Sequence, residues 1–207
     1  MNPDMKIIAI NGSPRKTWNT AALLKEALAG ATAQGADTEL IHLYDLNFKG
    51  CISCFACKRK QGVHGKCALK DDLTKVLEQL ENADALIFGS PIYYMNITAT
   101  MTALLERFLF AHSIYSLEIP TVFPRKIPSG FIYTTNATEK MFEELGVKQY
   151  LTLRESTIAK TLGKPVQSLY SGNTYQFSDY SRYESSMFSE ADKARHRAEQ
   201  FPLDCRK

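Results

Sequence analysis

Residues 11–20, Asn-Gly-Ser-Pro-Arg-Lys-Thr-Trp-Asn-Thr, place hydroxyl, amide and cationic side chains between two segments of different periodicity. The apolar residues of 5–11 predict a strand, and the apolar residues at helical spacing in 20–32 predict a helix. The first turn of such a helix offers unpaired backbone N–H groups and the positive end of the helix dipole, which together bind phosphate. The side chains expected to hold that phosphate are Ser13, Arg15, Lys16, Thr17, Asn19 and Thr20.

Two common phosphate loops are excluded because their residues are missing. The chain contains no G-x-x-x-x-G-K-[ST], the loop of kinases and GTPases, and Gly12 stands alone where a dinucleotide loop needs G-x-G-x-x-G. The loop that remains suits a terminal phosphate monoester. The alternative is a solvated turn in which Asn19 or Thr20 only caps the helix.

A second segment offers a surface for an aromatic ring. Residues 83–90 are almost continuously apolar, which predicts a buried central strand, and ligands of parallel sheets lie beyond the carboxyl ends of the strands. The residues expected to line the ring after this strand are Pro91, Ile92, Tyr93, Tyr94, Met95 and Asn96. Those expected at the end of the fourth strand are Thr134, Thr135 and Asn136. The alternative is that Tyr93 and Tyr94 are ordinary core or surface aromatics.

Four of the five cysteines lie in one loop, residues 50–67, with the spacing C-x2-C-x2-C-x9-C. Short gaps let thiolates converge on an iron–sulfur core, and four thiolates also suit a tetrahedral zinc site. Free reduced thiols are the third alternative, and all three remain open. The residues that would hold a metal are Cys51, Cys54, Cys57 and Cys67.

Length and composition fit one globular domain spanning residues 1–207. A net charge of +3 is too small to indicate nucleic-acid binding. No apolar run approaches the roughly 18 residues of a membrane span, and no basic-then-apolar leader is present, so we expect a cytoplasmic protein without membrane association. No H-E-x-x-H or G-x-S-x-G motif supports a metal hydrolase or an esterase.

Strand and helix patterns alternate along the chain, which predicts an α/β fold with a doubly wound parallel sheet between two layers of helices. The expected strands are 5–11, 38–43, 83–90, 127–135 and 165–170. The expected helices are 20–32, one opening at 71–73, 97–111 and 189–200, while 139–162 mixes helix signals with a break. A chain this short favours the strand order 2-1-3-4-5 in a three-layer α/β/α sandwich.

The pattern G-S-P-R-x-x-x-N-T at 12–20 and the segment S-P-I-Y at 90–93 resemble the NADPH-dependent FMN reductase and flavodoxin-like NAD(P)H oxidoreductase family. The resemblance covers residues 5 to about 170, although Trp18 stands where the family commonly has glycine. It implies a flavodoxin-like fold whose loop at 12–20 holds the phosphate of FMN while residues 91–96 and 134–136 frame the flavin ring. Relatives called iron–sulfur flavoproteins carry a compact four-cysteine motif, which implies a [4Fe-4S] cluster as one content of the loop at 50–67.

The resemblance also implies an activity. A flavin oxidoreductase of this kind takes electrons from NAD(P)H and passes them to a quinone, a flavin or another small-molecule acceptor, and no catalytic side chain is required. Relatives complete the flavin pocket across a two-fold interface, so the resemblance implies a homodimer or a dimer of dimers. The alternative function is an electron-transfer flavoprotein that serves protein partners without steady-state reductase activity.

Overall fold

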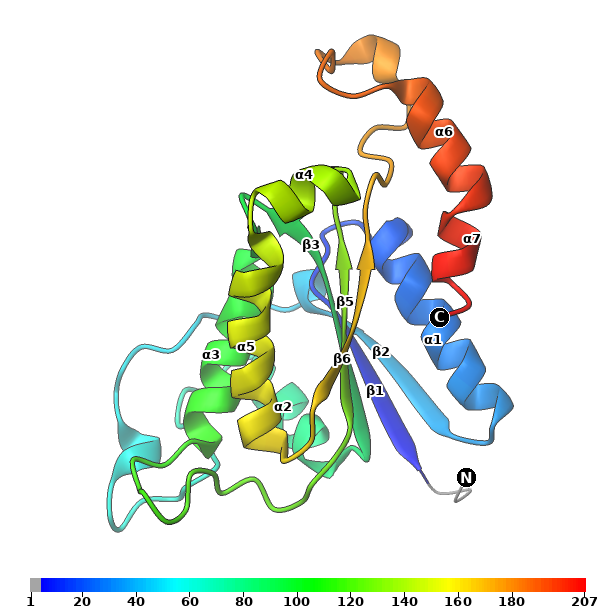
Figure 1. Cartoon of the computed structure of the whole chain (residues 1–207). Coiled ribbons are helices and arrows are strands. Elements are labelled where there is room, and N and C mark those ends of the chain that lie inside the picture. The colour runs from blue at the N-terminus through cyan, green and yellow to red at the C-terminus, as the bar shows by residue number, and fades with distance from the viewer. Residues whose placement is uncertain (1–4) are drawn as a thin grey trace.

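A computed structural model describes residues 5–207. At the centre of the molecule lies a twisted parallel sheet (Figure 1). The parallel strands are β1 (Lys6–Asn11), β2 (Asp37–His42), β3 (Ala85–Tyr93), β5 (Ser129–Thr134) and β6 (Val166–Ser171). They pair in the order β2-β1-β3-β5-β6, and the two-residue β4 (Asn96–Ile97) pairs antiparallel with the end of β3. Counted along the chain without β4, this is the predicted order 2-1-3-4-5 and confirms a flavodoxin-like fold. Residues 1–4 of the predicted single domain lie outside the described part, and the single domain stays a prediction.

Helices cover both faces of the sheet (Figure 1). One face carries α2 (Leu73–Asn82), α3 (Ala99–His112) and α5 (Val147–Leu162), and the other carries α1 (Asn19–Ala33) and α7 (Phe201–Asp204). The remaining helices are α4 (Glu139–Glu144) and α6 (Glu190–Glu199), with 3-10 turns at Leu43–Asp45, Ala56–Lys58 and Tyr180–Arg182. Within residues 5–207, none of the helices is both long enough and apolar enough to cross a bilayer.

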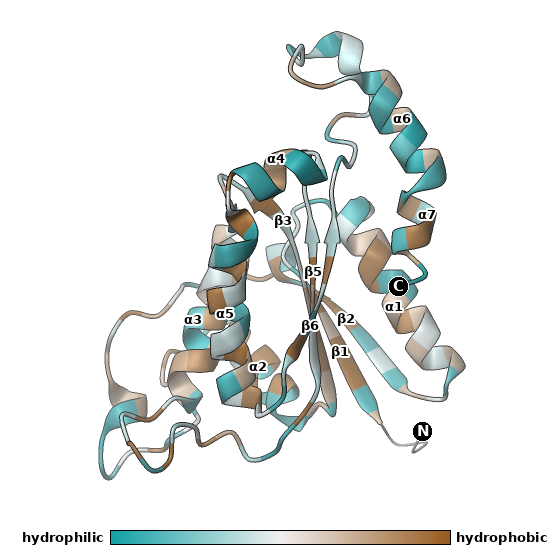
Figure 2. Cartoon of the chain, viewed as in Figure 1, coloured by the Kyte–Doolittle hydropathy of each residue, from teal (hydrophilic) through white to brown (hydrophobic). Residues whose placement is uncertain are grey.

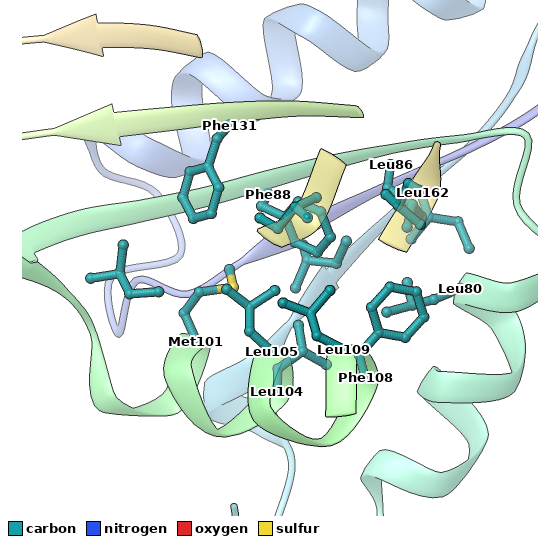
Figure 3. Packing of buried hydrophobic residues seen from close by; sticks show 14 of the residues in the cluster. Leu80, Leu86, Phe88, Met101, Leu104, Leu105, Phe108, Leu109, Phe131 and Leu162 are labelled. Atoms are coloured by element: carbon teal, nitrogen blue, oxygen red, sulfur yellow. The ribbon is translucent and has the colours of Figure 1, made fainter. Parts of the chain in front are cut away.

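The larger core lies between the sheet and α2, α3 and α5 (Figure 3). Leu86 and Phe88 are two residues apart in β3, so they point to the same face of the sheet, and both are fully buried. Met101, Leu104 and Phe108 follow one face of α3 and pack against them. The apolar residues concentrate in the central strands, while hydrophilic residues lie on the outward faces of the helices (Figure 2). This core holds the carboxyl ends of the strands in one row.

The structure corrects the expected end of the third strand and locates the break expected within 139–162. The third strand continues to Tyr93, so Pro91, Ile92 and Tyr93 belong to β3 and not to the expected loop. Tyr94 and Met95 form the tip of a hairpin into β4 and both adopt positive φ, at 47° and 64°, as a two-residue hairpin turn requires. The expected break within 139–162 falls at Gly146, whose φ of 62° ends α4 and allows α5 to begin.

Candidate functional site

The loop after β1 is shaped by its own short polar side chains. Asn11 is fully buried, and its Oδ1 accepts a hydrogen bond from the backbone N–H of Ser13 at 3.0 Å. Its Nδ2 lies 2.9 Å from Nδ1 of His42 at the end of β2, and burial lowers the pKa of that imidazole. The hydroxyl of Ser13 in turn accepts from the N–H of Arg15 at 3.1 Å. These bonds fold the loop back on itself, as asparagine and serine side chains do in turns.

Gly12 brings this loop against β3. Its N–H donates to the carbonyl of Gly89 at 2.8 Å, and its own carbonyl accepts from the hydroxyl of Thr98 at 2.8 Å. A Cβ added at Gly12 would stand 2.9 Å from Cβ of Met101 and 3.2 Å from the Gly89 carbonyl oxygen. Glycine therefore permits the close approach of the first loop to the third strand.

The helix that follows begins without a side-chain cap. The residue before α1 is Trp18, whose backbone is extended and whose side chain makes no capping hydrogen bond. The N–H groups of the first turn are therefore free to face an anion. The guanidinium of Arg15 lies 4.5 Å from the centroid of the Trp18 ring, a cation–π contact that holds the charge beside the loop. Trp18, which departs from the family pattern, thus positions Arg15.

A cavity of about 140 Å³ lies at the carboxyl ends of β1, β3 and β5, beside the start of α1. The hydroxyls of Thr20 and Thr134 join the walls of the cavity through a hydrogen bond of 2.7 Å. The residues of the sequence prediction that line the cavity are Ser13, Arg15, Asn19, Thr20, Pro91, Ile92, Tyr93, Thr134, Thr135 and Asn136. Burial raises the pKa of Tyr93, and Oδ1 of Asn136 is buried without a hydrogen-bond partner in residues 5–207.

The other expected ligand contacts lie outside this cavity, and their roles stay predictions. Lys16 forms an ion pair with Asp45, and Thr17 is exposed. Tyr94 is fully exposed at the hairpin tip, next to the half-exposed Met95. Oδ1 of Asn96 accepts from the N–H of Ile97 and from Arg154, 2.9 and 2.8 Å away.

One wall of the cavity was not predicted from the sequence. Thr174, Tyr175 and Gln176 follow β6 and line the cavity. The Asn19 amide donates to the carbonyl of Tyr175 at 2.8 Å, and the Arg15 guanidinium donates to the carbonyl of Gln176. The rule that parallel strands end at one edge of the sheet could have drawn attention to this segment, because it directly follows the fifth strand.

The cysteine loop is held by two neighbouring residues of α3. The carboxylate of Glu106 accepts from the backbone N–H of Cys51 at 3.1 Å. Arg107 is almost completely buried and donates to the carboxylate of Asp71 at 2.5 Å, to the carbonyl of Leu69 at 2.8 Å and to the Cys67 sulfur at 3.4 Å. Glu106 and Arg107 were not among the site residues predicted from the sequence.

The four expected cysteines line one small, largely apolar cavity. Burial raises the pKa of the Cys57 thiol, and the nearby Cys67 and Cys51 add to that rise. Ser53 and Phe55 adopt positive φ of 53° and 54°, which curls the backbone around the thiols. In the described part of the chain, no three His, Cys, Asp or Glu side chains converge closely enough to hold one metal ion. The structure therefore brings the thiols together without a preformed single-ion site.

The parallel strand order, with a cavity at the strand ends beside an uncapped helix, defines a flavodoxin-like protein. Residues 5–118 match the profile of the NADPH-dependent FMN reductase family, and the chain belongs to that family.

Curated relatives agree with this membership. An iron–sulfur flavoprotein of Methanocaldococcus jannaschii is 40% identical over 103 residues, which are 50% of this chain and 51% of that protein. An iron–sulfur flavoprotein of Archaeoglobus fulgidus is 42% identical over 103 residues, 50% of this chain and 48% of that protein. The chain thus spans about half the length of these curated relatives.

A solved structure shows the same fold along almost the whole of the chain. The NAD(P)H:quinone oxidoreductase of Methanothermobacter marburgensis superposes with a TM-score of 0.67 at 20% identity, covering 97% of this chain and 99% of that one.

Proposed function

We propose that this chain is an FMN-dependent NAD(P)H oxidoreductase that passes electrons to a quinone, a flavin or another small-molecule acceptor. The observation that carries the proposal is the cavity at the strand ends, where a phosphate loop with an uncapped helix meets the Pro91–Tyr93 wall. Membership of the NADPH-dependent FMN reductase family supports it. When bound, FMN supplies hydride and electron transfer, and the protein supplies position and electrostatics.

The residues present fit the phosphate of FMN. Among the residues of 5–207 that line the cavity, Arg15 is the one cation and none carries a carboxylate. The Ser13 hydroxyl, the first-turn N–H groups of α1 and the Thr20 hydroxyl add hydrogen-bond donors beside that charge. A dianionic phosphate prefers such a set, because donors and positive charge meet with no competing anion.

The residues after β3 fit the flavin ring. Pro91 has no N–H to leave unpaired, and its ring, Ile92 and Tyr93 give the wall a largely apolar surface. The buried Oδ1 of Asn136, which lacks a partner in the described residues, stands ready to accept from an N–H group of a ligand. These side chains orient the ring and exclude water from one of its sides.

Steady-state oxidation of NADPH by the FMN-loaded chain, with a quinone or ferricyanide as acceptor, tests the proposal. We expect turnover that depends on added FMN and falls when Arg15 is replaced by Gln. An FMN-loaded chain that does not oxidise NADPH would refute the reductase function and leave the electron-transfer flavoprotein as the better description.

The electron-transfer function is a second candidate because the four cysteines line one small, largely apolar cavity. Cys51, Cys54, Cys57 and Cys67 would hold a [4Fe-4S] cluster, as the names of the curated relatives suggest. Anaerobic reconstitution followed by iron and sulfide analysis tests it. Four irons and four sulfides per chain would support the cluster, whereas bound zinc or unreacted thiols would contradict it.

We further infer a homodimer or a dimer of dimers. An open groove of about 600 Å³ between α3 and α5 exposes the apolar side chains of Tyr150 and Leu153 and is also lined by Cys51. Exposed apolar surface of this kind is typical of an interface. Light scattering after size-exclusion chromatography should give at least twice the chain mass of 23.3 kDa.

A further inference from the structure

Helix α6 carries two cations that contact residues lining the cavity at the strand ends. Lys193 and Arg197 are four residues apart, so they lie on one face of the helix. That face is directed at the loops after β5 and β6 and at the start of α1, which are far away in the sequence.

Lys193 is fully buried behind the two loops. Its ammonium donates to the carbonyl of Asn136 at 3.0 Å, to Oδ1 of Asn173 at 3.2 Å and to the carbonyl of Thr174 at 3.2 Å. No carboxylate oxygen of residues 5–207 lies within ion-pair distance of Lys193, and burial lowers the pKa of this lysine to about 8. A buried charge without a counter-ion is costly, and three oxygen acceptors offset only part of that cost.

Arg197 lies at the first residue of α1. Its Nη1 donates to Oδ1 of Asn19 at 3.2 Å, and its guanidinium lies 4.1 Å from the centroid of the Phe201 ring. The same Asn19 side chain donates to the carbonyl of Tyr175. Arg197 thus stands beside the uncapped helix N-terminus at which the proposed function places the phosphate.

The charge balance of the cavity explains why these cations would be needed. A phosphate monoester carries close to two negative charges at neutral pH. Arg15 supplies one positive charge from the cavity wall, whereas Lys16 is already paired with Asp45. One further cation would balance the ligand, and α6 places two next to residues that line the cavity.

We propose that α6 is part of the phosphate site: Arg197 binds the phosphate beside the start of α1, and Lys193 is a positioning residue that holds the loops after β5 and β6 and adds positive charge behind them. This inference rests on the proposed function, because it presumes that FMN occupies the cavity.

Comparing FMN with riboflavin, which lacks the phosphate, isolates the effect of these charges. We expect Arg197→Gln to raise the Kd of FMN about fivefold, the loss of roughly 1 kcal/mol for a partly exposed charge, and to leave the Kd of riboflavin unchanged. Arg197→Lys should restore most of the FMN affinity. Arg195→Gln is the matched control, because Arg195 lies on the same helix and pairs with Asp192, and it should change neither Kd.

Lys193→Met tests the buried charge, with urea unfolding to show that the variant is folded. It should weaken FMN binding more than riboflavin binding. Equal losses for the two flavins, or no loss in either α6 variant, would overturn the inference and leave α6 a structural cover. A wild-type chain that binds neither flavin would refute the proposed function as well. If the wild type binds FMN tightly but the α6 variants keep its ratio of FMN to riboflavin Kd values, only this inference is refuted.

Discussion

Replacing Arg107 by Met should destabilise the chain far more than the loss of a surface arginine does. The Arg107 guanidinium is buried and binds the Cys67 sulfur at the end of the cysteine loop and the carbonyls of Lys49 and Leu69 on either side of that loop, besides its ion pair with Asp71. Methionine fills similar volume but leaves the Asp71 carboxylate and two carbonyls without their donor.

The expected loss is roughly 3–5 kcal/mol of the free energy of unfolding, which is the usual result of removing one partner from a buried ion pair. For a chain of this length that corresponds to a fall in Tm of about 10 °C. Arg125→Met is the matched control. Arg125 also binds a carboxylate, that of Asp84, and two backbone carbonyls, but its side chain is 41% exposed. We expect the control to lose about 1 kcal/mol or less.

Urea unfolding followed by circular dichroism measures both variants, and thiol labelling of the folded protein reports on the loop. Arg107→Met should label Cys67 faster than the wild type does, because the loop is no longer held against α3. An Arg107→Met variant that is no less stable than Arg125→Met would refute the assignment of Arg107 as the residue that secures the cysteine loop.

Two further predictions concern the flavin site and its cover. Gly12→Ala should cost roughly 1–3 kcal/mol of stability and weaken FMN binding, because its Cβ would crowd Met101 and the Gly89 carbonyl. Gly30→Ala in α1 is the control, because the space around Gly30 is open, and it should stabilise the fold by roughly 0.5–1 kcal/mol. The urea midpoint of each variant measures its stability, and titration with FMN measures its binding. A Gly12→Ala variant with the urea midpoint and the FMN affinity of the wild type would contradict the close approach of the first loop to β3. Burial lowers the pKa of Lys193 from 10.5 to about 8, so between these values the unfolded chain binds more protons and the free energy of unfolding should rise with pH. Lys193→Met should lack this rise when both proteins are unfolded in urea from about pH 7.5 to about pH 11 (roughly the range that brackets the shift), and parallel pH profiles would contradict it.

The sheet could be predicted from the sequence because each strand has a local apolar pattern of its own. The buried run in 83–90 and the helical stripe of Leu73, Val76, Leu77 and Leu80 depend on periodicity alone, and all four of these leucine and valine side chains are buried in α2. The strand, loop and helix start of residues 6–33 were predictable for the same reason, since they are contiguous in the sequence.

The unpredicted parts of the site depend on contacts between distant segments. The extension of β3 through Pro91 to Tyr93 arises because Pro91 pairs in register with Thr134 and because the hairpin returns through β4. The contacts of Lys193 with Asn136 and of Arg197 with Asn19 join residues 57 and 178 positions apart. A local sequence pattern does not show which distant residues come into contact. The sequence therefore predicted a helix at 189–200 but not the residues that this helix contacts.

The most direct test of the central claim is an anaerobic titration of the FMN-loaded chain with NADPH, followed through the visible absorption of the flavin. We predict that one equivalent of NADPH bleaches the flavin band of each chain and that adding a quinone restores it. A chain that fails to retain FMN, or a bound flavin whose absorption does not change with NADPH, would contradict the claim that this is an FMN-dependent NAD(P)H oxidoreductase.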